Sequence, residues 1–389
     1  MQVQVALGTR MGVKLKILVT GSSGFLGKNL IARLKAQKEE NHIIYKYDTD
    51  TSKDQLMEYA KDCEFVFYFA AVHRPKKEEE FHQINVLLFE DLIALLEKQQ
   101  NNCPILYTSS IQAVQNTPYA KSKREAEDVL IKHCEKTGDK AIIYRLTNTF
   151  GKWATPNHHS VVATFCHNIT RELEIQIDNP DHSMDFYYID DVIDSFISHL
   201  YTDKNPDSDG FYRLDNKYRY TTTLKELANK LTEFHEFRQT LSLPNTADSF
   251  TKKLYSTYLS YLPIHTFHYP LTMHTDDRGS FTEIFKTPEQ GQFSINVIKP
   301  GIKKGEHYHN TKCEKFLVVS GSALIQFRKI DSEEVVNYYA SSEELEVIDI
   351  PVGYTHNIMN IGEEDLVTLI SANEVFQKEN PDTYPLPVE

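Results

Sequence analysis

The chain has 389 residues, too many for one ordinary hydrophobic core, and this length indicates two domains. Its formal net charge of −13 argues against nucleic acid or an anionic membrane as the main partner, because either would require a basic face. No apolar run approaches the roughly 20 residues that cross a bilayer. Five scattered cysteines without a C-x-x-C pair are typical of reduced thiols, so we expect a cytoplasmic protein.

Residues 1–13 show no hydrophobic periodicity, and we interpret them as a disordered leader or tag. From Leu15 onwards, short apolar strands alternate with helical segments, which predicts a Rossmann-like α/β domain with a parallel sheet over residues 14–245. Residues 246–262 are expected to form a linker. Short strands separated by Gly, Pro and Asp turns then predict an all-β domain over residues 263–389.

A glycine-rich segment, TGSSGFLG at residues 20–27, follows an apolar strand and opens a predicted helix. Gly21 permits the turn, Gly24 lets the backbone approach a pyrophosphate, and Gly27 lets helix and strand pack closely. This context is the one that a dinucleotide-binding loop requires. We therefore predict a nicotinamide dinucleotide site at the end of the first strand.

Tyr119 and Lys123 are four residues apart on a predicted helix and share one face, and Ser109 and Ser110 end the strand upstream. A nearby ammonium lowers the pKa of a phenol, which lets a tyrosine exchange a proton with a substrate oxygen near neutral pH. A single Tyr–Lys pair more often marks a solvated helix face. The glycine loop on the same chain favours a catalytic pair instead.

From Leu15 to Leu243 the chain resembles the extended short-chain dehydrogenase/reductase family, in its nucleotide-sugar branch. The motifs that carry the resemblance are TGSSGFLG, FAA at 69–71, TSS at 108–110, PYAKSK at 118–123, YRLTNTFG at 144–151 and DFYYIDDV at 185–192. The resemblance implies that Tyr119 donates or accepts the proton, that Lys123 binds ribose and lowers the pKa of Tyr119, and that Ser110 positions the substrate. The implied cofactor contacts are Gly21, Ser23, Gly24, Phe25, Leu26, Gly27, Asp48, Ala70 and Lys123.

Asp48, just after the second predicted strand, leaves the cofactor preference open. An acidic side chain there accepts hydrogen bonds from a ribose 2′-hydroxyl and repels a 2′-phosphate, which favours NADH. Asp48 is equally well explained as a turn residue of DTDTS, and Lys28, Arg74 and Lys76 could receive a phosphate.

Four residues of the C-terminal domain, His307, His309, Glu314 and His356, have the spacing of a metal-binding cupin, an all-β jelly roll. The first two histidines point to one side of a strand, Glu314 lies on the next stretch, and His356 follows a Pro-x-Gly turn. Three imidazoles and a carboxylate suit Zn²⁺, and Fe²⁺, Mn²⁺ and Ni²⁺ remain alternatives. Leu345 replaces the glycine that usually opens the second cupin motif, which weakens the turn prediction but not the ligand set.

The same domain also resembles the cupin-fold 3,5-epimerases of 4-keto-6-deoxy nucleotide sugars, through DDRGSFTE at 276–283 and GEHYH at 305–309. This resemblance implies that His307 is the base that removes a proton beside the ketone and that Lys315 contacts the substrate. His307 therefore has two candidate roles, metal ligand and base, and the sequence leaves both open.

From Leu15 onwards the paired motifs resemble the bifunctional capsule-biosynthesis enzymes that join such a reductase to a metal cupin. The resemblance implies a UDP-4-keto-6-deoxy-N-acetylhexosamine substrate, namely a UDP-2-acetamido-2,6-dideoxy-4-hexulose. The cupin would epimerise C3, and the reductase would then use NADPH to reduce C4. The product would be UDP-2-acetamido-2,6-dideoxy-L-talose, a precursor of N-acetyl-L-fucosamine. Epimerisation must come first, because the C4 ketone is what makes the C3 hydrogen acidic.

The resemblance further implies a homodimer through the cupin domain. Two alternatives remain at this level. The first is a 4-ketoreductase whose cupin is only a metal-stabilised dimerisation module, and the second is a non-catalytic nucleotide sensor that retains the fold.

Overall fold

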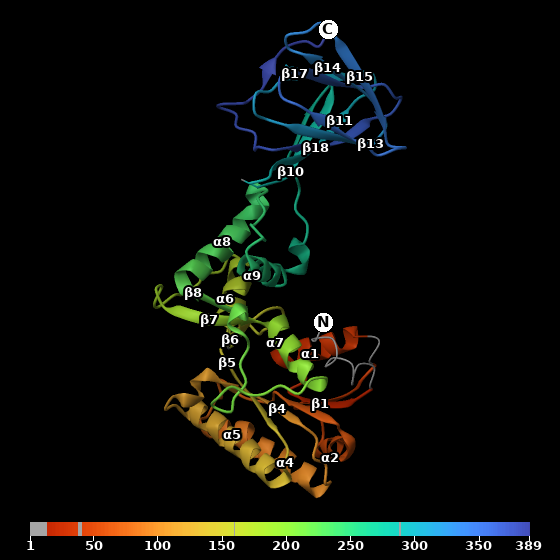
Figure 1. Ribbon diagram of the computed structural model, residues 1–389. Coiled ribbons are helices and arrows are strands. Elements are labelled where there is room, and N and C mark those ends of the chain that lie inside the picture. The colour runs from red at the N-terminus through yellow and green to blue at the C-terminus, as the bar shows by residue number, and fades with distance from the viewer. Residues whose placement is uncertain (1–13, 38–40, 159, 288) are drawn as a thin grey trace. The chain divides into compact units, whose positions relative to one another are not determined.

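The computed structural model describes residues 14–37, 41–158, 160–287 and 289–389, so the expected leader at 1–13 lies outside the described residues. The chain divides into two units (Figure 1). The first comprises the described residues up to Thr232 together with Asp248–Pro263, and the second comprises Glu233–Ala247 and Ile264–Glu389.

The first unit contains a parallel sheet with the order β2-β1-β3-β4-β5. Its strands are β1 (Lys16–Thr20), β2 (Ile43–Tyr47), β3 (Phe65–Tyr68), β4 (Ile105–Ser110) and β5 (Ala141–Leu146). Alternate residues of β1 face opposite sides, since Ile17 and Val19 belong to one buried cluster and Leu18 to the other. These apolar strands, buried on both faces, are why the sheet takes helices on each side.

Helices α1 (Phe25–Ala36) and α7 (Ile189–Ile197) cover one face of this sheet. Helices α2 (Lys53–Asp62), α4 (Leu88–Lys98) and α5 (Pro118–Thr137) cover the other. The short helices are α3 (Glu79–His82), the π-helix η1 (Gln83–Leu87), η2 (Ile111–Val114), η3 (Ser198–Leu200), η4 (Asn216–Tyr218) and, in the second unit, η5 (Ile264–Thr266). The predicted doubly wound α/β arrangement is confirmed.

A smaller sheet follows, with strands β6 (Asn148–Phe150), β7 (Ser183–Tyr188) and β8 (Arg219–Thr223) and with helices α6 (Val161–Ile169), α8 (Leu224–Thr240) and α9 (Ser249–Leu259). Helix α9 occupies most of 246–262, where we expected a linker. The Asp248 carboxylate caps it by accepting from the Thr251 amide at 2.7 Å, and Leu254 and Tyr258 are fully buried. The segment Asp248–Pro263 therefore packs as part of the first unit.

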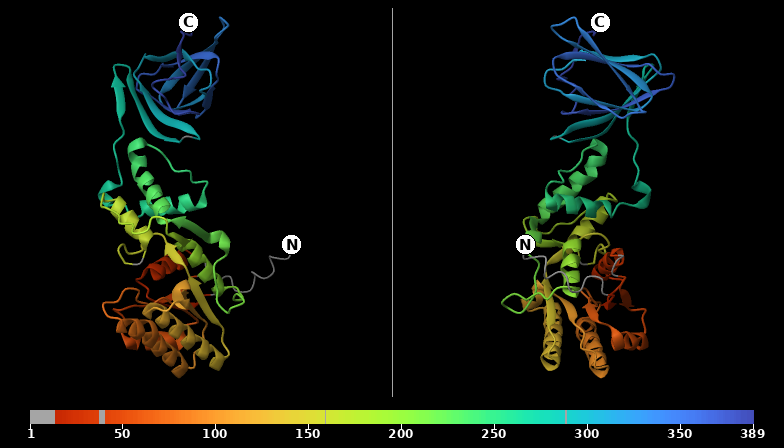
Figure 2. Two further views of the ribbon diagram at one scale, coloured as in Figure 1. Left: turned by 90° about the vertical axis from the view of Figure 1, so that its left-hand side faces the viewer. Right: turned by 45° about the vertical axis from the view of Figure 1, so that its right-hand side comes forward.

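The second unit contains the end of α8 and η5, and its main part is a β domain of two antiparallel sheets (Figure 2). One has the order β16-β13-β18-β11-β10-β9 and the other β15-β14-β17-β12-β19. The strands are β9 (Met273–Asp276), β10 (Gly279–Thr287), β11 (Gly291–Ile298), β12 (Lys303–Tyr308), β13 (Glu314–Ser320), β14 (Ser322–Lys329), β15 (Val335–Ser341), β16 (Val347–Ile350), β17 (Tyr354–Asn360), β18 (Leu366–Ala372) and β19 (Tyr384–Pro385).

Phe316, Ile325, Phe327, Ile358 and Leu366 form the centre of a core contributed by both sheets. This architecture confirms the predicted β domain of the cupin type. No helix in the described part of the chain is long and apolar enough to cross a membrane.

Candidate active site and metal centre

The glycine loop links β1 to α1, and its geometry requires glycine at two positions. Gly21 has φ +61°, and a Cβ atom there would lie 2.9 Å from the Ala70 nitrogen. A Cβ at Gly27 would lie 2.3 Å from the Gly21 carbonyl oxygen. The Thr20 hydroxyl accepts from the amides of Phe69 and Ala70, at 3.1 and 3.2 Å, and so joins the loop to the end of β3. The loop therefore has no room for a side chain at Gly21 or Gly27, and it leads into the N-terminus of α1, where a pyrophosphate can bind.

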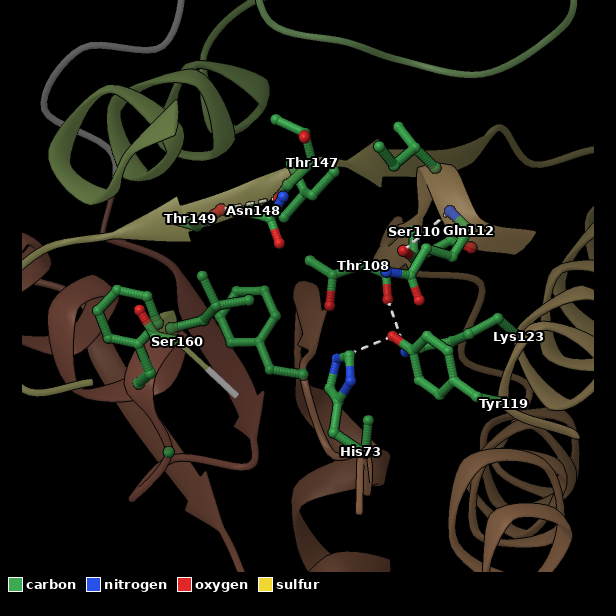
Figure 3. A pocket seen from close by; sticks show the side chains of 18 of the residues that line it. His73, Thr108, Ser110, Gln112, Tyr119, Lys123, Thr147, Asn148, Thr149 and Ser160 are labelled. Atoms are coloured by element: carbon green, nitrogen blue, oxygen red, sulfur yellow. Dashed lines mark hydrogen bonds between the residues drawn. The ribbon is translucent and has the colours of Figure 1, made fainter. Parts of the chain in front are cut away.

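A cavity of about 240 Å³ opens beside this loop at the carboxyl ends of the strands. Ten of its lining residues are labelled in Figure 3: His73, Thr108, Ser110, Gln112, Tyr119, Lys123, Thr147, Asn148, Thr149 and Ser160. Of the predicted cofactor contacts, Gly21, Gly24, Phe25, Leu26 and Lys123 line it as well. Gly27 and Ala70 instead pack against the glycine loop, since both lie in close contact with Gly21.

Asp48 lies at the end of β2 and binds the glycine loop directly. Its carboxylate accepts from both the amide and the hydroxyl of Ser23, each at 2.7 Å. Burial alone would raise the pKa of the Asp48 carboxyl, but the hydrogen bonds from Ser23 and Thr49 outweigh burial and hold the pKa below its ordinary value. The ionised Asp48 carboxylate, held by Ser23, therefore places a negative charge in the region where the ribose of a dinucleotide is expected.

Helix α5 brings Tyr119 and Lys123 to the same cavity as Ser110. Thr117 caps the helix and Pro118 occupies its first turn, so that Tyr119 enters the site from the first turn. Tyr119 is 8 % and Lys123 3 % exposed. The Lys123 ammonium donates to the Thr108 carbonyl at 3.0 Å, and the Ser110 hydroxyl accepts from the Gln112 amide at 3.1 Å. The structure thus brings together the three residues that the sequence predicted.

The pKa of Tyr119 departs from our expectation. We expected Lys123 to lower it, whereas burial raises the pKa of Tyr119, and a hydrogen bond with Ser110 offsets only part of that rise. Burial also lowers the pKa of Lys123 to about 8, against an opposing contribution from Glu127. Both shifts follow from the same desolvation, which disfavours the phenolate and the ammonium alike.

His73 is a cavity residue that the sequence analysis missed. It follows β3, and its Nε2 atom lies 2.8 Å from the Tyr119 hydroxyl (Figure 3). The two rings are 4.3 Å apart between centroids. The available signal was its position just beyond the carboxyl end of β3, the edge at which ligands of parallel sheets bind.

A buried ion pair fixes the helix that carries Tyr119 and Lys123. The Glu127 carboxylate of α5 accepts from Arg145 of β5 at 2.9 and 2.7 Å and from the Ser109 hydroxyl at 2.5 Å. The Glu127 side chain is 4 % exposed. Both serines line the cavity, but the Ser109 hydroxyl is bound to Glu127, whereas Ser110 is the serine that hydrogen-bonds to Tyr119.

In the second unit His307, His309, Glu314 and His356 converge, with one ligand atom of each lying within 4.8 Å of the others. His307 and His356 face each other across β12 and β17, and Glu314 begins β13. The Glu314 Oε2 atom lies 3.4 Å from His309 Nε2 and 3.5 Å from His356 Nε2. The buried Nε2 of His309 makes no hydrogen bond within the described parts of the chain, which leaves it available to a metal ion.

The electrostatics of this cluster suit a divalent cation. Burial is the main reason that the pKa of His307 falls to about 4, and the neighbouring His356 and His309 contribute further. Its imidazole is therefore neutral at neutral pH. Burial would raise the pKa of Glu314, but the adjacent His309 and His356 side chains and the nearby Lys312 ammonium hold it far below its usual value. Neutral imidazoles and an ionised carboxylate are the forms that bind metals, so the four residues fit the predicted ion.

Lys315 does not lie with this cluster. Residues Glu314, Phe316 and Val318 of β13 point inward, so Lys315 points outward, 60 % exposed and paired with Asp349. The substrate contact implied for Lys315 is not supported by this placement. The cation beside the cluster is instead Lys312, 13 % exposed, with its Nζ 3.4 Å from Glu314 Oε1.

A dinucleotide loop joined to a Tyr–Lys–Ser cavity, followed by a β domain with a buried His₃Glu cluster, defines a chain with a dehydrogenase/reductase unit and a cupin-like unit. The NAD dependent epimerase/dehydratase family matches residues 17–212, and the polysaccharide biosynthesis C-terminal domain matches residues 274–384. The chain belongs to the NAD-dependent epimerase/dehydratase family, within the group of capsule-biosynthesis proteins that share both units.

Two relatives share nearly the whole chain. A UDP-2-acetamido-2,6-beta-L-arabino-hexul-4-ose reductase of Pseudomonas aeruginosa is 40 % identical over 370 residues, which are 95 % of this chain and 98 % of the relative. The crystal structure of the capsular polysaccharide assembling protein CapF from Staphylococcus aureus has 42 % sequence identity and a TM-score of 0.90, with 96 % of this chain and 100 % of that chain covered. The resemblance to capsule-biosynthesis proteins that join a reductase unit to a C-terminal β domain is thereby confirmed.

Proposed function

We propose that this protein is a bifunctional nucleotide-sugar enzyme of capsular polysaccharide biosynthesis. Its substrate is a UDP-2-acetamido-2,6-dideoxy-4-hexulose, whose C3 is epimerised by the cupin unit before C4 is reduced by the first unit. The observation that carries the proposal is the presence of the Tyr119 cavity and the His₃Glu cluster on one chain whose similarity to a UDP-hexul-4-ose reductase spans both units.

In the reduction, NAD(P)H supplies a hydride to C4 of the sugar. The glycine loop and Lys123 would hold the cofactor, and Ser110 and Tyr119, which line the same cavity, would hold the C4 oxygen. The Tyr119 hydroxyl gives its proton to that oxygen as the alcohol forms, and the Lys123 ammonium stabilises the resulting phenolate. We take NADPH as the expected cofactor from the family resemblance, and Asp48 keeps NADH as the alternative.

In the epimerisation, the proton at C3 leaves to one face and returns on the other. His307, His309, Glu314 and His356 hold a divalent cation, for which Zn²⁺ is the expected ion. A bound cation supplies charge stabilisation for the enediolate. His307 is the residue with two candidate roles, because its neutral imidazole suits a base as well as a ligand. The C3 epimer is the form that the first unit then reduces, and we further propose a homodimer through the cupin unit.

The test is to give the purified protein a UDP-4-keto-6-deoxy-N-acetylhexosamine in D₂O and to follow it by NMR with NADPH, NADH or neither. We expect deuterium at C3 without either cofactor and the L-talo product with NADPH. Tyr119→Phe should stop reduction and leave the exchange, whereas His307→Gln should stop the exchange. Reduction without exchange in the unmodified protein would favour a ketoreductase whose cupin serves only assembly. Unchanged NAD(P)H oxidation in Tyr119→Phe would contradict the reductase mechanism.

A further inference from the structure

The segment Asp382–Glu389, which we call the strap, runs alongside the metal cluster in the second unit. Its strand β19 pairs with β12, placing Pro385 opposite His307 and Tyr384 opposite Tyr308. Further along the strap, Arg328 donates to the carbonyls of Pro387 and Val388 at 2.7 and 2.8 Å. The strap is thus hydrogen-bonded both to β12, which carries His307, and to β14.

The Asp382 carboxylate holds the loop between two of the cluster residues. It accepts from the backbone amides of Asn310, Thr311 and Lys312, at 3.0, 2.6 and 2.8 Å. This loop joins His309 to Glu314, so its conformation sets the separation of their side chains. Three amides converging on one carboxylate make a well-defined loop conformation that the loop sequence alone does not enforce.

Asp382 also determines the tautomer of His309. Its backbone carbonyl contacts His309 Nδ1, and because a carbonyl oxygen only accepts, Nδ1 must carry the proton. The unprotonated Nε2, which faces Glu314, is then the ligand atom. A histidine ligand oriented through its second nitrogen by a protein oxygen is the usual arrangement in metal sites.

The far end of the strap supports His307. A β-bulge lies between Gly305 and His307, and Glu306 within it has φ +62°, a conformation that only surrounding contacts can maintain. The strap supplies those contacts, since the Leu386 amide donates to the Glu306 carbonyl at 2.9 Å and the Val388 amide to its carboxylate at 2.6 Å. The bulge sets the direction of the His307 side chain.

We infer that the strap is the positioning element of the metal centre and that Asp382 is its principal residue. It holds His309 in the ligand tautomer and fixes the His309–Glu314 loop at the spacing that a divalent cation needs. This inference rests on the proposed metal centre, and it assigns a role to a segment outside the ligand motif. Loss of such outer contacts typically weakens metal affinity about 10–100-fold.

The test is a Zn²⁺ titration of the metal-stripped full-length chain in competition with a chromogenic chelator. We expect Asp382→Ala to bind Zn²⁺ about 10–100-fold more weakly, and Asp382→Asn to lose less because it keeps one acceptor oxygen. The control is Asp365→Asn, an exposed carboxylate of the same unit that pairs with Lys299 at 2.9 Å and should leave affinity unchanged. The Co²⁺ absorption spectrum should change in the Asp382 variants alone.

Circular dichroism of the metal-free variants establishes whether they are folded. If Asp382→Ala does not fold, the Zn²⁺ affinity of Asp382→Asn tests the inference instead. Zn²⁺ affinity within twofold of the unmodified protein in the folded Asp382 variants would overturn the inference while leaving the proposed function intact. If the unmodified protein itself binds no Zn²⁺, Co²⁺ or other divalent ion, the proposed metal centre fails, and the inference fails with it.

Discussion

Lys123 is expected to lower the stability of the fold while being required for the proposed reduction. Its ammonium is buried, donates to one carbonyl, that of Thr108, and lies 5.0 Å from the centre of the Tyr107 ring. Burial lowers its pKa from 10.5 to about 8. Between those two values the unfolded chain binds a proton that the folded chain has released, so this group makes folding more favourable as the pH rises. At neutral pH the folded protein carries the full cost of the buried charge.

We therefore expect Lys123→Met to increase the free energy of unfolding at pH 7 by about 1–3 kcal/mol while abolishing NAD(P)H oxidation. The gain should shrink at pH 9.5, where the unmodified lysine is already largely neutral in the folded state. Urea denaturation at both pH values measures this difference. Lys121→Met is the matched control, because Lys121 lies on the same helix with 72 % of its side chain exposed. A loss of stability in Lys123→Met would contradict the argument.

His73 is expected to act as a positioning residue for the Tyr119 hydroxyl, from which its Nε2 lies 2.8 Å away. Removing one hydrogen bond of ordinary strength should lower kcat for reduction by about tenfold in His73→Ala. The KM for the cofactor should change little, and the pH profile of kcat should shift because the environment of the phenol changes. His82→Ala is the control, since His82 is exposed and pairs with Glu125 at 3.1 Å. A change confined to KM would assign His73 to binding instead.

The site residues that we predicted from the sequence lie close in the chain to the residues they act with. The site residues that we did not predict contact residues that are distant in the chain. Tyr119 and Lys123 are separated by one helical turn, and His307 and His309 by the two-residue repeat of an extended chain, so local periodicity was sufficient to pair them. His73 meets Tyr119 across 46 residues and Asp382 meets His309 across 73. Such pairs depend on how the elements pack, and one sequence carries no local signal for them.

Among the elements, α5 has the greatest effect on the first site because it carries Tyr119 and Lys123. Its attachment to the sheet includes Glu127, which binds Arg145 of β5 and Ser109 of β4. Breaking a buried ion pair by removing one partner leaves the other charge uncompensated. We expect Glu127→Gln to lower the free energy of unfolding by about 3 kcal/mol and to reduce turnover through displacement of the helix.

Urea denaturation monitored on the first unit measures this loss. Glu125→Gln on the same helix is the control, and because Glu125 forms only partly exposed pairs, its effect should stay below about 1 kcal/mol. Equal effects in the two variants would show that the Glu127 network does not hold the helix. Retained turnover despite lower stability would separate the anchoring of α5 from its positioning of Tyr119.

The hydrophobic pattern predicted the strands and helices of the first unit, but it did not predict the helix within residues 246–262. Its mixture of Tyr, Ser, Thr and Leu has weak periodicity, and we expected a linker. The helix that forms there, α9, obtains its stability from tertiary contacts, including Lys253 with Asp191 at 2.6 Å and the Tyr261 hydroxyl with the Ala154 carbonyl at 2.6 Å. Asp248 as an N-cap was the one local signal of a helix start.

At the scale of the whole molecule, each of the two candidate sites lies within a unit that has its own hydrophobic core. Residues around Val19 and Leu18 form the clusters of the first unit, and residues around Ile325 form that of the second. A change at one centre therefore need not disturb the other, which fits two reactions that use different chemistry. In the proposed function, the order of the two reactions is set by the acidity of C3 and not by the order of the units in the chain.

This separation predicts that metal removal acts on one unit only. The His₃Glu cluster links β12, β13 and β17, so a bound cation adds to the stability of the second unit by about 2.7 kcal/mol at a concentration of 100 Kd. Chelation should lower the melting temperature of that unit in calorimetry and should abolish deuterium exchange at C3. Reduction of a sugar already epimerised at C3 should continue, because Tyr119, Lys123 and Ser110 lie in the other unit.

His309→Gln in the presence of Zn²⁺ should reproduce the effects of the chelator, since His309 is 1 % exposed and belongs to the cluster. Gly27→Ala should instead abolish reduction and leave the exchange at C3 unchanged. The added Cβ would collide with the Gly21 carbonyl and so impair cofactor binding. Loss of reduction of the epimerised sugar on chelation would show that the metal serves both centres. Unchanged melting of the second unit would show that the cluster contributes to chemistry without stabilising the fold.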